Sequence, residues 1–413
     1  MPTVSIAHSA DKHRSREGVY SLVREALERL GGFGAFVKPG QTVLIKPDQS
    51  VPRLAEEGAT TDPLLVGALV RLARETGAAK VQVAASSSGF FDSLACMKIT
   101  GMAAAAEREG AELIDLGSDR VPNREVDLPE AEVLHRARLP IPLLEADATI
   151  AVLKAKTDSL DIISGSVEFC GGALNQNWRA LQSEDGMLER FADMMEVLRP
   201  DLCITDALIC GEGDGPHAGF PRWRGAILAC ADPVAMDVMI AALMGCDWTK
   251  LRFAAALEER GLGRREPMVM LGMPLERISF RGWPAHRGFE HLPVNVIAGR
   301  GVSEFGTLRH VKSALEVLLR RGELQQVLHT AGTPTIMIGE ADDPDFERHL
   351  QEGPYVVFDD AARPEYKDDP RIFFVSGHPV LRGATRELMR ILNLEELERK
   401  RRMRSRLSPS EID

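Results

Sequence analysis

Five short apolar runs in the first 240 residues each end in polar side chains, and this repeat constrains the fold more than any other feature. The runs are VLIKPDQS, VQVAASSSG, TIAVLKAKT, LCITDALICGEGDGP and AILACADPVAMD, beginning at Val43, Val81, Thr149, Leu202 and Ala226. Helical patterns separate them, and alternation of strands and helices is typical of a parallel α/β sheet. Ligands bind outside the carboxyl ends of such strands. The five ends therefore predict one active-site rim for a small anionic ligand.

The predicted helices cover residues 17–30, 60–78, 96–110, 186–198 and 233–245. Thr61 or Asp62 is expected to cap the second of them, with Pro63 in its first turn, and Asp232 to cap the last. Residues 121–148 alternate and contain several prolines, which predicts an antiparallel extension. Residues 158–180 are rich in Gly, Ser and Asn and are interpreted as a long functional loop.

A second strand–helix alternation follows a break near residues 276–292. Its expected strands are VNVIAG, TPTIMIG, YVVFDD and RIFFVSG. We therefore expect an α/β protein with a mostly parallel open sheet flanked by helices, plus a second, smaller α/β domain. The main domain is expected over 1–285, and the C-terminal domain, with a charged helical tail, over 286–413.

Composition narrows the function classes. The net charge of −11 disfavours non-specific nucleic-acid binding. No apolar run approaches the roughly 20 residues that span a bilayer, and the N-terminus has no apolar signal core, so we expect a cytoplasmic protein without a membrane partner. None of the six cysteines forms a CxxC pair, so no iron–sulfur cluster is expected. Homo-oligomerisation is left open.

Lysines at strand ends are the first candidates for ligand binding. Lys46 follows VLI, and Lys154 and Lys156 end TIAVLKAKT just before Thr157. We expect these four residues to bind a carboxylate or phosphate, because the low dielectric of a cleft strengthens that contact. Removal of the Lys154 side chain is expected to weaken ligand binding and leave the fold intact.

A serine-rich turn, SSSG, follows the second run. Ser87 and Ser88 are predicted to contact the anion through hydroxyl and backbone N–H groups. A serine-rich helix cap is the competing interpretation of the same turn. No GK[ST] follows, so this is not a Walker motif.

Three residues are the candidates for acid–base catalysis. Asp206 lies near the end of LCITDAL, Glu212 lies in GEGDGP, and His217 follows that turn. Clustered carboxylates are able to hold Mg²⁺, but their spacing matches no known cation loop, so the cofactor is left open and no metal ligand is assigned. His378, in SGHPV, is a further candidate. Cys170 lies in the Gly-rich stretch EFCGGALN, where an exposed reactive thiol is the less favoured of two interpretations and a reduced core cysteine the other.

The order KPD, TTDP, LKAKT, TDA, GEGDGP, ADPVAMD resembles the uncharacterised family called domain of unknown function 362, over roughly residues 40–250. That family usually reads KPN and KTH, where this chain has Asp48 and Asp158. Several relatives carry a ferredoxin-like cysteine segment that this chain lacks. More distantly, residues 37–89 look like the first domain of nickel-pincer lactate racemases, which implies two α/β domains with a cleft between them. The histidines of that loop are serines here, and the lysine segment that anchors the pincer is not recognisable.

Together these observations predict an enzyme that acts on a small carboxylated or phosphorylated metabolite in an interdomain cleft, with lyase or isomerase chemistry. The alternative is a non-catalytic protein that binds an anionic cofactor, or an accessory redox partner without its own iron–sulfur cluster.

Overall fold

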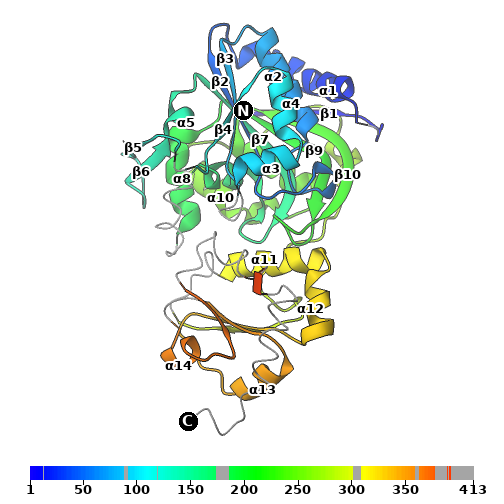
Figure 1. Cartoon of the computed structure of the whole chain (residues 1–413). Helices are drawn as coiled ribbons and strands as arrows, with labels where there is room; N and C mark the ends of the chain where they lie inside the picture. The colour runs from blue at the N-terminus through cyan, green and yellow to red at the C-terminus, as the bar shows by residue number, and fades with distance from the viewer. Residues whose placement is uncertain are drawn as a thin grey trace. The chain divides into compact units, whose positions relative to one another are not determined.

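The computed structural model describes residues 1–12, 14–87, 92–118, 120–173, 186–300, 308–358, 362–376, 388, 390 and 391. These residues fall into two compact units, one up to Ala285 and one from His286 onward. Each unit has its own sheet with helices around it (Figure 1). The α/β class predicted from the sequence, with a second smaller α/β unit, is confirmed.

The first unit is built on a nine-stranded sheet. The main path runs β11-β1-β10-β9-β7-β2-β3-β4, and β8 pairs with β7. The strands are β1 (Thr3–His8), β2 (Thr42–Pro47), β3 (Lys80–Ala85), β4 (Glu112–Asp115), β7 (Ala148–Asp158), β8 (Ile162–Ile163), β9 (Leu202–Glu212), β10 (Phe220–Cys230) and β11 (Val269–Gly272). The sequence patterns identified the inner strands but not β1 or β11.

The direction of β10 corrects the expectation that all five polar strand ends lie on one rim. Strands β2, β3, β7 and β9 run parallel, so their carboxyl ends share one edge of the sheet. β10 runs antiparallel to β9, with Cys230 opposite Cys203. Asp232, which follows β10, therefore lies at the other edge, and only four of the five polar strand ends share a rim.

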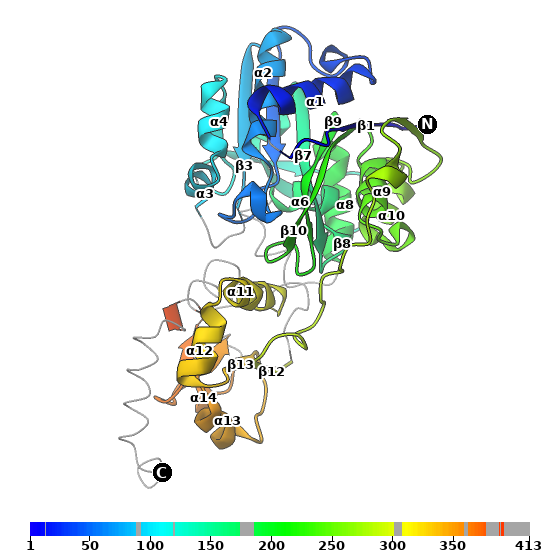
Figure 2. The ribbon, with the colours of Figure 1, turned by 90° about the vertical axis from the view of Figure 1, so that its right-hand side faces the viewer.

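Helices cover both faces of this sheet (Figure 2). One layer contains α1 (Arg16–Glu28), α2 (Pro63–Glu75), α3 (Ser93–Ile99) and α4 (Met102–Arg108), and its apolar residues form one core with the strands. The other contains α6 (Gly165–Gly171), α8 (Met187–Leu198), α9 (Pro233–Leu243) and α10 (Arg252–Glu259). The single helix expected over 96–110 is broken at Gly101, whose φ of 80° is accessible to glycine.

The predicted cap of the helix at Asp62 and the predicted antiparallel extension within residues 121–148 are both present. Asp62 accepts a hydrogen bond from Leu64 N–H at the start of α2. Residues 123–140 form the antiparallel pair β5 (Asn123–Asp127) and β6 (Arg136–Pro140), followed by α5 (Ile141–Glu145). Short 3-10 turns cover Phe33–Ala35, Ala55–Glu57, Trp248–Lys250 and Leu275–Arg277.

The second unit has a four-stranded parallel sheet in the order β12-β13-β14-β15. Its strands are β12 (Asn295–Ala298), β13 (Thr335–Ile338), β14 (Tyr355–Phe358) and β15 (Phe373–Val375), and its helices are α11 (Arg309–Arg320), α12 (Glu323–Ala331), α13 (Phe346–Glu352) and α14 (Pro364–Lys367). Each strand matches a run identified from the sequence. His378 and the charged tail lie outside the described residues.

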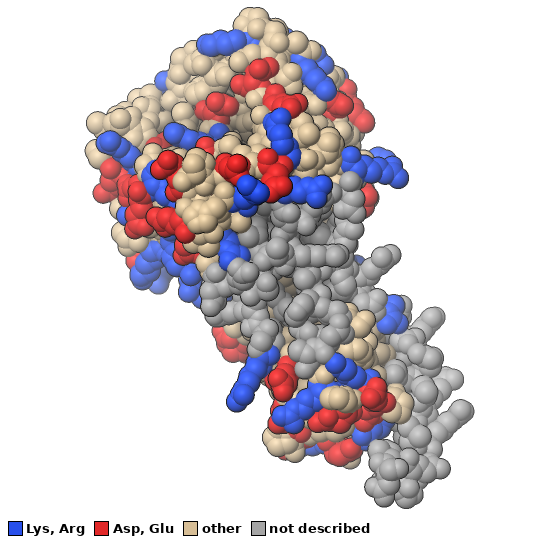
Figure 3. Space-filling view, turned by 90° about the vertical axis from the view of Figure 1, so that its left-hand side faces the viewer, with Lys and Arg blue, Asp and Glu red and all other residues tan. Residues whose placement is uncertain are grey.

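Among the described residues, no helix has the length and apolar character needed to cross a membrane. Acidic and basic side chains intermingle on the face of the first unit that Figure 3 shows, without a broad area of one sign.

Asp232 offers a test of how α9 begins. Its carboxylate accepts hydrogen bonds from Val234 N–H at 2.9 Å and Ala235 N–H at 3.0 Å. We expect Asp232→Ala to lower the free energy of unfolding by about 0.5–2 kcal/mol, measured by urea denaturation, because two backbone donors lose their acceptor. Asp232→Asn keeps an acceptor oxygen and should cost less. Equal losses in the two variants would contradict the capping role.

Candidate functional site

Two lysines of β7 are buried in ion pairs. Lys154 Nζ lies 2.8 Å from Asp206 Oδ2, and both side chains are fully buried. Lys156 Nζ lies 2.7 Å from Asp48 Oδ1 and donates to the Ala59 carbonyl at 2.9 Å. Both lysines lie within the strand rather than at an exposed rim. This burial argues against the expectation that Lys154 is dispensable for the fold, because its removal would leave a carboxylate buried without its cation.

Asp206 joins three elements. Besides Lys154 of β7, its carboxylate accepts hydrogen bonds from Asp62 N–H at 2.7 Å, where α2 begins, and from Leu208 N–H at 3.0 Å within β9. Burial, followed by the charge of Asp206, raises the pKa of Asp62, which pairs with Arg14. These contacts favour a structural role for Asp206.

Lys46 is buried without such a partner. Its side chain is 4% exposed, and within the described part of the chain its Nζ has one hydrogen-bond acceptor, the Glu168 carbonyl at 3.4 Å. No carboxylate of those residues lies within ion-pair distance. The ammonium also sits 5.2 Å from the centroid of the Phe169 ring. Burial is the largest cause that lowers the pKa of Lys46, against the raising effect of nearby Glu168 and Asp48.

Helix α6 covers Lys46, and the sequence analysis missed it. Residues 162–171, expected to be part of a loop, form β8 and α6 instead. A Cβ on Gly172 would lie 2.5 Å from Lys46 Nζ, so glycine permits the amine to approach the end of this helix. The usable signal was EFCGG, in which Glu168 interrupts an apolar run before two glycines. Cys170 is fully buried there, and burial raises the pKa of its thiol.

Glu168 is partly exposed, and the charge of its carboxyl acts on Lys46. Burial and the charge of Asp48 raise the pKa of Glu168 to about 7, while Lys156 and Lys46 act in the opposite direction. A carboxyl and an amine whose pKa values move toward neutrality in one place are typical of acid–base sites.

Polar atoms without partners flank Lys46. Asp48 Oδ2 and Gln49 Oε1 are buried and have no hydrogen-bond partner among the described residues. Gln49 donates to Ser87 Oγ at 3.4 Å and to the Ser93 carbonyl at 3.1 Å. Ser87 is thus brought to the carboxyl end of β2, as predicted, whereas Ser88 lies outside the described residues. Buried acceptors of this kind are usually satisfied by water, an ion or a ligand.

The remaining predicted residues have other contacts. Thr157 Oγ1 donates to the Gly213 carbonyl at 2.7 Å. Glu212 accepts from Arg222 Nε at 2.9 Å and from Trp283 N–H at 3.1 Å. The His217 carbonyl accepts a hydrogen bond from Arg53. The contacts of Thr157 and Glu212 favour structural roles, and catalysis by Glu212 or His217 stays a prediction.

A second group of buried carboxyls holds α6 and α10 in place. Asp237 accepts hydrogen bonds from the Ser166 N–H at 2.8 Å and from the Ser166 hydroxyl. Burial raises the pKa of Asp237 to about 7. Asp161 accepts from Phe253 N–H at 2.8 Å, and burial raises its pKa to about 6.

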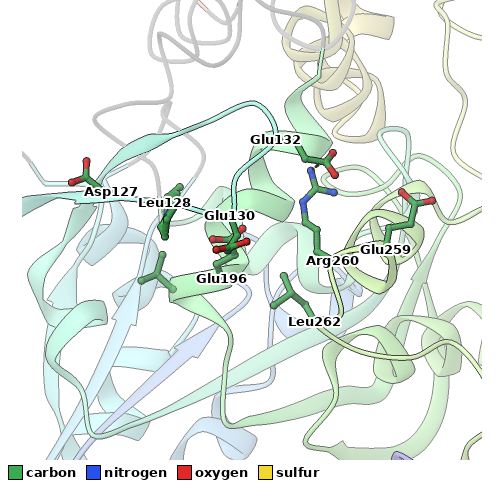
Figure 4. A pocket seen from close by; sticks show the side chains of 10 residues that line it. Asp127, Leu128, Glu130, Glu132, Glu196, Glu259, Arg260 and Leu262 are labelled. Atoms are coloured by element: carbon green, nitrogen blue, oxygen red, sulfur yellow. Dashed lines mark hydrogen bonds and ion pairs between the residues drawn. The ribbon is translucent and has the colours of Figure 1, made fainter.

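A separate pocket of about 560 Å³ lies beside the β5–β6 loop, α8 and α10 (Figure 4). Half of its lining residues are acidic, and Arg260 is held there by Asp193 at 2.9 Å and Glu132 at 2.9 Å. The lining residues are Asp127, Leu128, Pro129, Glu130, Glu132, Glu196, Val197, Glu259, Arg260 and Leu262. None of the site residues predicted from the sequence lines it.

Comparison with known proteins agrees with the resemblance seen in the sequence. Residues 43–242 match the model of the family described as Domain of unknown function (DUF362). The matched residues contain the two lysine–carboxylate pairs, Lys46 and Glu168. Asp48 pairs with Lys156, and Asp158 accepts hydrogen bonds from Leu160 N–H and the Ser164 hydroxyl.

One curated relative is Thylakoid-associated protein sll1697 of Synechocystis, 27% identical over 248 residues, which cover 58% of this chain and 74% of that protein. The lactate racemase apoprotein structure from Thermoanaerobacterium thermosaccharolyticum aligns over 95% of this chain and 91% of its own, at 10% identity and a TM-score of 0.36. A Thermotoga maritima protein structure aligns over 84% and 76%, at 12% identity and a TM-score of 0.33. At these TM-scores the structural alignments carry no functional argument.

The Lys154–Asp206 pair gives a stability test. Asp206→Ala should lower the free energy of unfolding by about 3–5 kcal/mol, because Lys154 would stay buried without its counter-charge. The double variant Lys154→Met/Asp206→Leu removes both charges and should lose much less. Chemical denaturation of the three proteins measures this. A double variant as unstable as the single one would show that the charge pair is not the cause.

Asp237 gives a pH test. The folded protein binds its proton more tightly than the unfolded chain, since the pKa rises from 3.8 to about 7. Between those pH values the contribution of Asp237 to stability therefore falls as pH rises. Asp237→Asn should remove this loss, so its stability relative to wild type should increase from pH 4 to pH 7, by on the order of 1–4 kcal/mol. A difference independent of pH in urea denaturation would contradict the assignment.

Proposed function

We propose that the chain is an enzyme that transfers protons on a small anionic metabolite, carboxylated or phosphorylated, with lyase or isomerase chemistry. Its site lies in the first unit, where the carboxyl end of β2 meets α6. The observation that carries the proposal is Lys46, a buried amine without a carboxylate partner among the described residues, beside two lysines that each have one. An anionic ligand would supply the missing counter-charge.

Glu168 supports the proton-transfer part of the proposal. An acid with a pKa of about 7 carries its proton in part of the population at neutral pH, and so is able both to donate and to accept it. Glu168 is also partly exposed, which allows it to exchange protons with solvent. We therefore assign the proton transfer to Glu168 and Lys46, and the support of β7 to Lys154, Lys156 and their carboxylates.

The unpartnered acceptors add a requirement for the ligand. Asp48 Oδ2 and Gln49 Oε1 need hydrogen-bond donors, which a hydroxyl group or a bound water would provide. We propose that Ser87 and Gln49 form the side of the site next to β3. A cytoplasmic location and a homo-oligomeric state remain part of the proposal.

The alternative is a non-catalytic protein that binds an anionic cofactor, and it also relies on the charge of Lys46. Such a protein would bind the anion tightly and leave it chemically unchanged, whereas an enzyme would convert it. Incubation of each ligand that binds with the wild-type protein, followed by mass spectrometry of the small molecule, separates the two.

Lys46→Met tests the proposed function. Methionine fills a similar volume without the charge, so we expect the fold to survive and the affinity for anions to fall roughly tenfold or more, since a hydrogen bond to a charged group contributes about 1.5–3 kcal/mol. Isothermal titration calorimetry with inorganic phosphate, pyruvate and succinate measures the change.

The matched control is Lys98→Met, which removes an exposed lysine of α3 and should leave binding unchanged. Wild-type protein that binds no anion more tightly than Lys46→Met would contradict the proposal. Circular dichroism of both variants establishes that a loss of binding is not a loss of fold.

A further inference from the structure

The three buried lysines within residues 43–242 differ in the partners of their amines. The amines of Lys154 and Lys156 lie 2.8 Å and 2.7 Å from carboxylate oxygens and are engaged in these ion pairs. Among the described residues, the hydrogen-bond acceptor of the Lys46 amine is a backbone carbonyl at the long distance of 3.4 Å. A lysine needs an available nitrogen lone pair to act as a nucleophile, so Lys46 is the best suited of the three to that role.

The surroundings of Lys46 also favour the neutral amine. The Phe169 ring and the buried Cys170 thiol lie on α6 beside it, and Gly172 leaves the space that the amine occupies. Removal from water penalises the ammonium form and lowers the pKa of Lys46. Desolvation of this kind activates lysines for attack on carbonyl carbons.

We propose that Lys46 forms a Schiff base with the carbonyl carbon of a small 2-oxo acid. The inference rests on the proposed function, and it specifies both the substrate class and a covalent mode for the same site. The carboxylate makes the ligand anionic, and the neighbouring carbonyl carbon receives the attack.

The chemistry balances with groups of this chain. The Nζ lone pair forms a bond to the carbonyl carbon, the C=O π electrons move to oxygen, and the amine proton reaches that oxygen to give a carbinolamine. Glu168, in its protonated form, donates a proton to the hydroxyl group, the C–O bond breaks, and water leaves. The products are a protonated imine on Lys46 and an ionised Glu168, so the net change is one amine, one carbonyl and one proton converted into an iminium and water. No oxidant or reductant is needed.

The site tolerates the positive charge of the iminium. This cation forms at Nζ, where the ammonium form of Lys46 would also carry its charge, and the ionised Glu168 carboxylate lies close enough to influence it electrostatically. The iminium then withdraws electrons from the adjacent carbon, which facilitates loss of a proton or a carboxyl group there. This matches the lyase or isomerase chemistry of the proposed function.

Reductive trapping tests the inference on the full-length protein. Wild-type protein is incubated at neutral pH with pyruvate and sodium cyanoborohydride, which reduces an imine to a stable secondary amine, and then digested for peptide mass spectrometry. We expect a reduced pyruvate adduct on Lys46, formed faster than on the exposed Lys98, because burial lowers the pKa of Lys46 and so increases its neutral fraction. Lys154 and Lys156 should stay unlabelled.

Two variants complete the experiment. Lys46→Arg should abolish the specific adduct and leave slow labelling of exposed lysines. Glu168→Gln should slow adduct formation on Lys46 by roughly a hundredfold, the scale of general acid catalysis, without changing the circular dichroism spectrum.

The outcomes separate this inference from the proposed function. Labelling confined to exposed lysines, together with calorimetric binding of pyruvate that depends on Lys46, would overturn the Schiff base and leave the anion site standing. Absence of both labelling and binding of any tested anion would overturn both. Equal labelling of Lys46 and Lys98 would show ordinary amine reactivity and would also overturn the inference.

Discussion

The buried pair of Lys154 and Asp206 is the interaction on which the first unit depends. Its two charges lie in register on β7 and β9, and the same carboxylate accepts a hydrogen bond from the backbone where α2 begins. Two charges removed from water are costly, and they remain stable only because the geometry is close and the remaining acceptor positions are filled. The pair therefore fixes the order of three elements around the end of β2, and the position of Lys46 follows from that order.

The anion binding proposed for Lys46 comes from an unequal distribution of counter-charges among the three buried lysines. Three lysines meet near the carboxyl ends of β2 and β7, yet carboxylates neutralise two of them. Asp48 accounts for one of these neutralisations. Among the described residues, the single amine of the three left without a carboxylate then becomes the distinctive chemical feature of the region. A site of this kind depends as much on where the carboxylates are placed as on where the lysines are.

The sequence predicted the central strands and the caps at Asp62 and Asp232, because periodicity and N-cap residues are local signals. It did not predict β1 or β11, because these depend on pairing between residues more than 200 positions apart, such as Thr3 and Val269, and it gave no signal for the direction of β10, which follows from its antiparallel pairing with β9. For the site, it assigned Lys46, Ser87 and Lys154 to the ends of three strands that the structure pairs in parallel, and their binding role stays a prediction. It failed on the partners of the lysines: periodicity shows which face a residue is on, whereas the carboxylate that meets it comes from another segment. Glu168 was missed for the same reason, since its proximity to Lys46 exists only once α6 has packed on the sheet.

The antiparallel strand β10 has a consequence for how the molecule is made. β1 pairs only with β10 and β11 in the described sheet, so residues 3–8 find their neighbours after residues 220–272 have been synthesised. During translation the first strand of the chain must wait, unpaired, while the central parallel strands form without it. Closing so long a loop makes docking of this strand a late and slow step. The nascent chain therefore exposes the edge of β9 until β10 covers it, and that interval is when the protein is most open to misassociation on the ribosome.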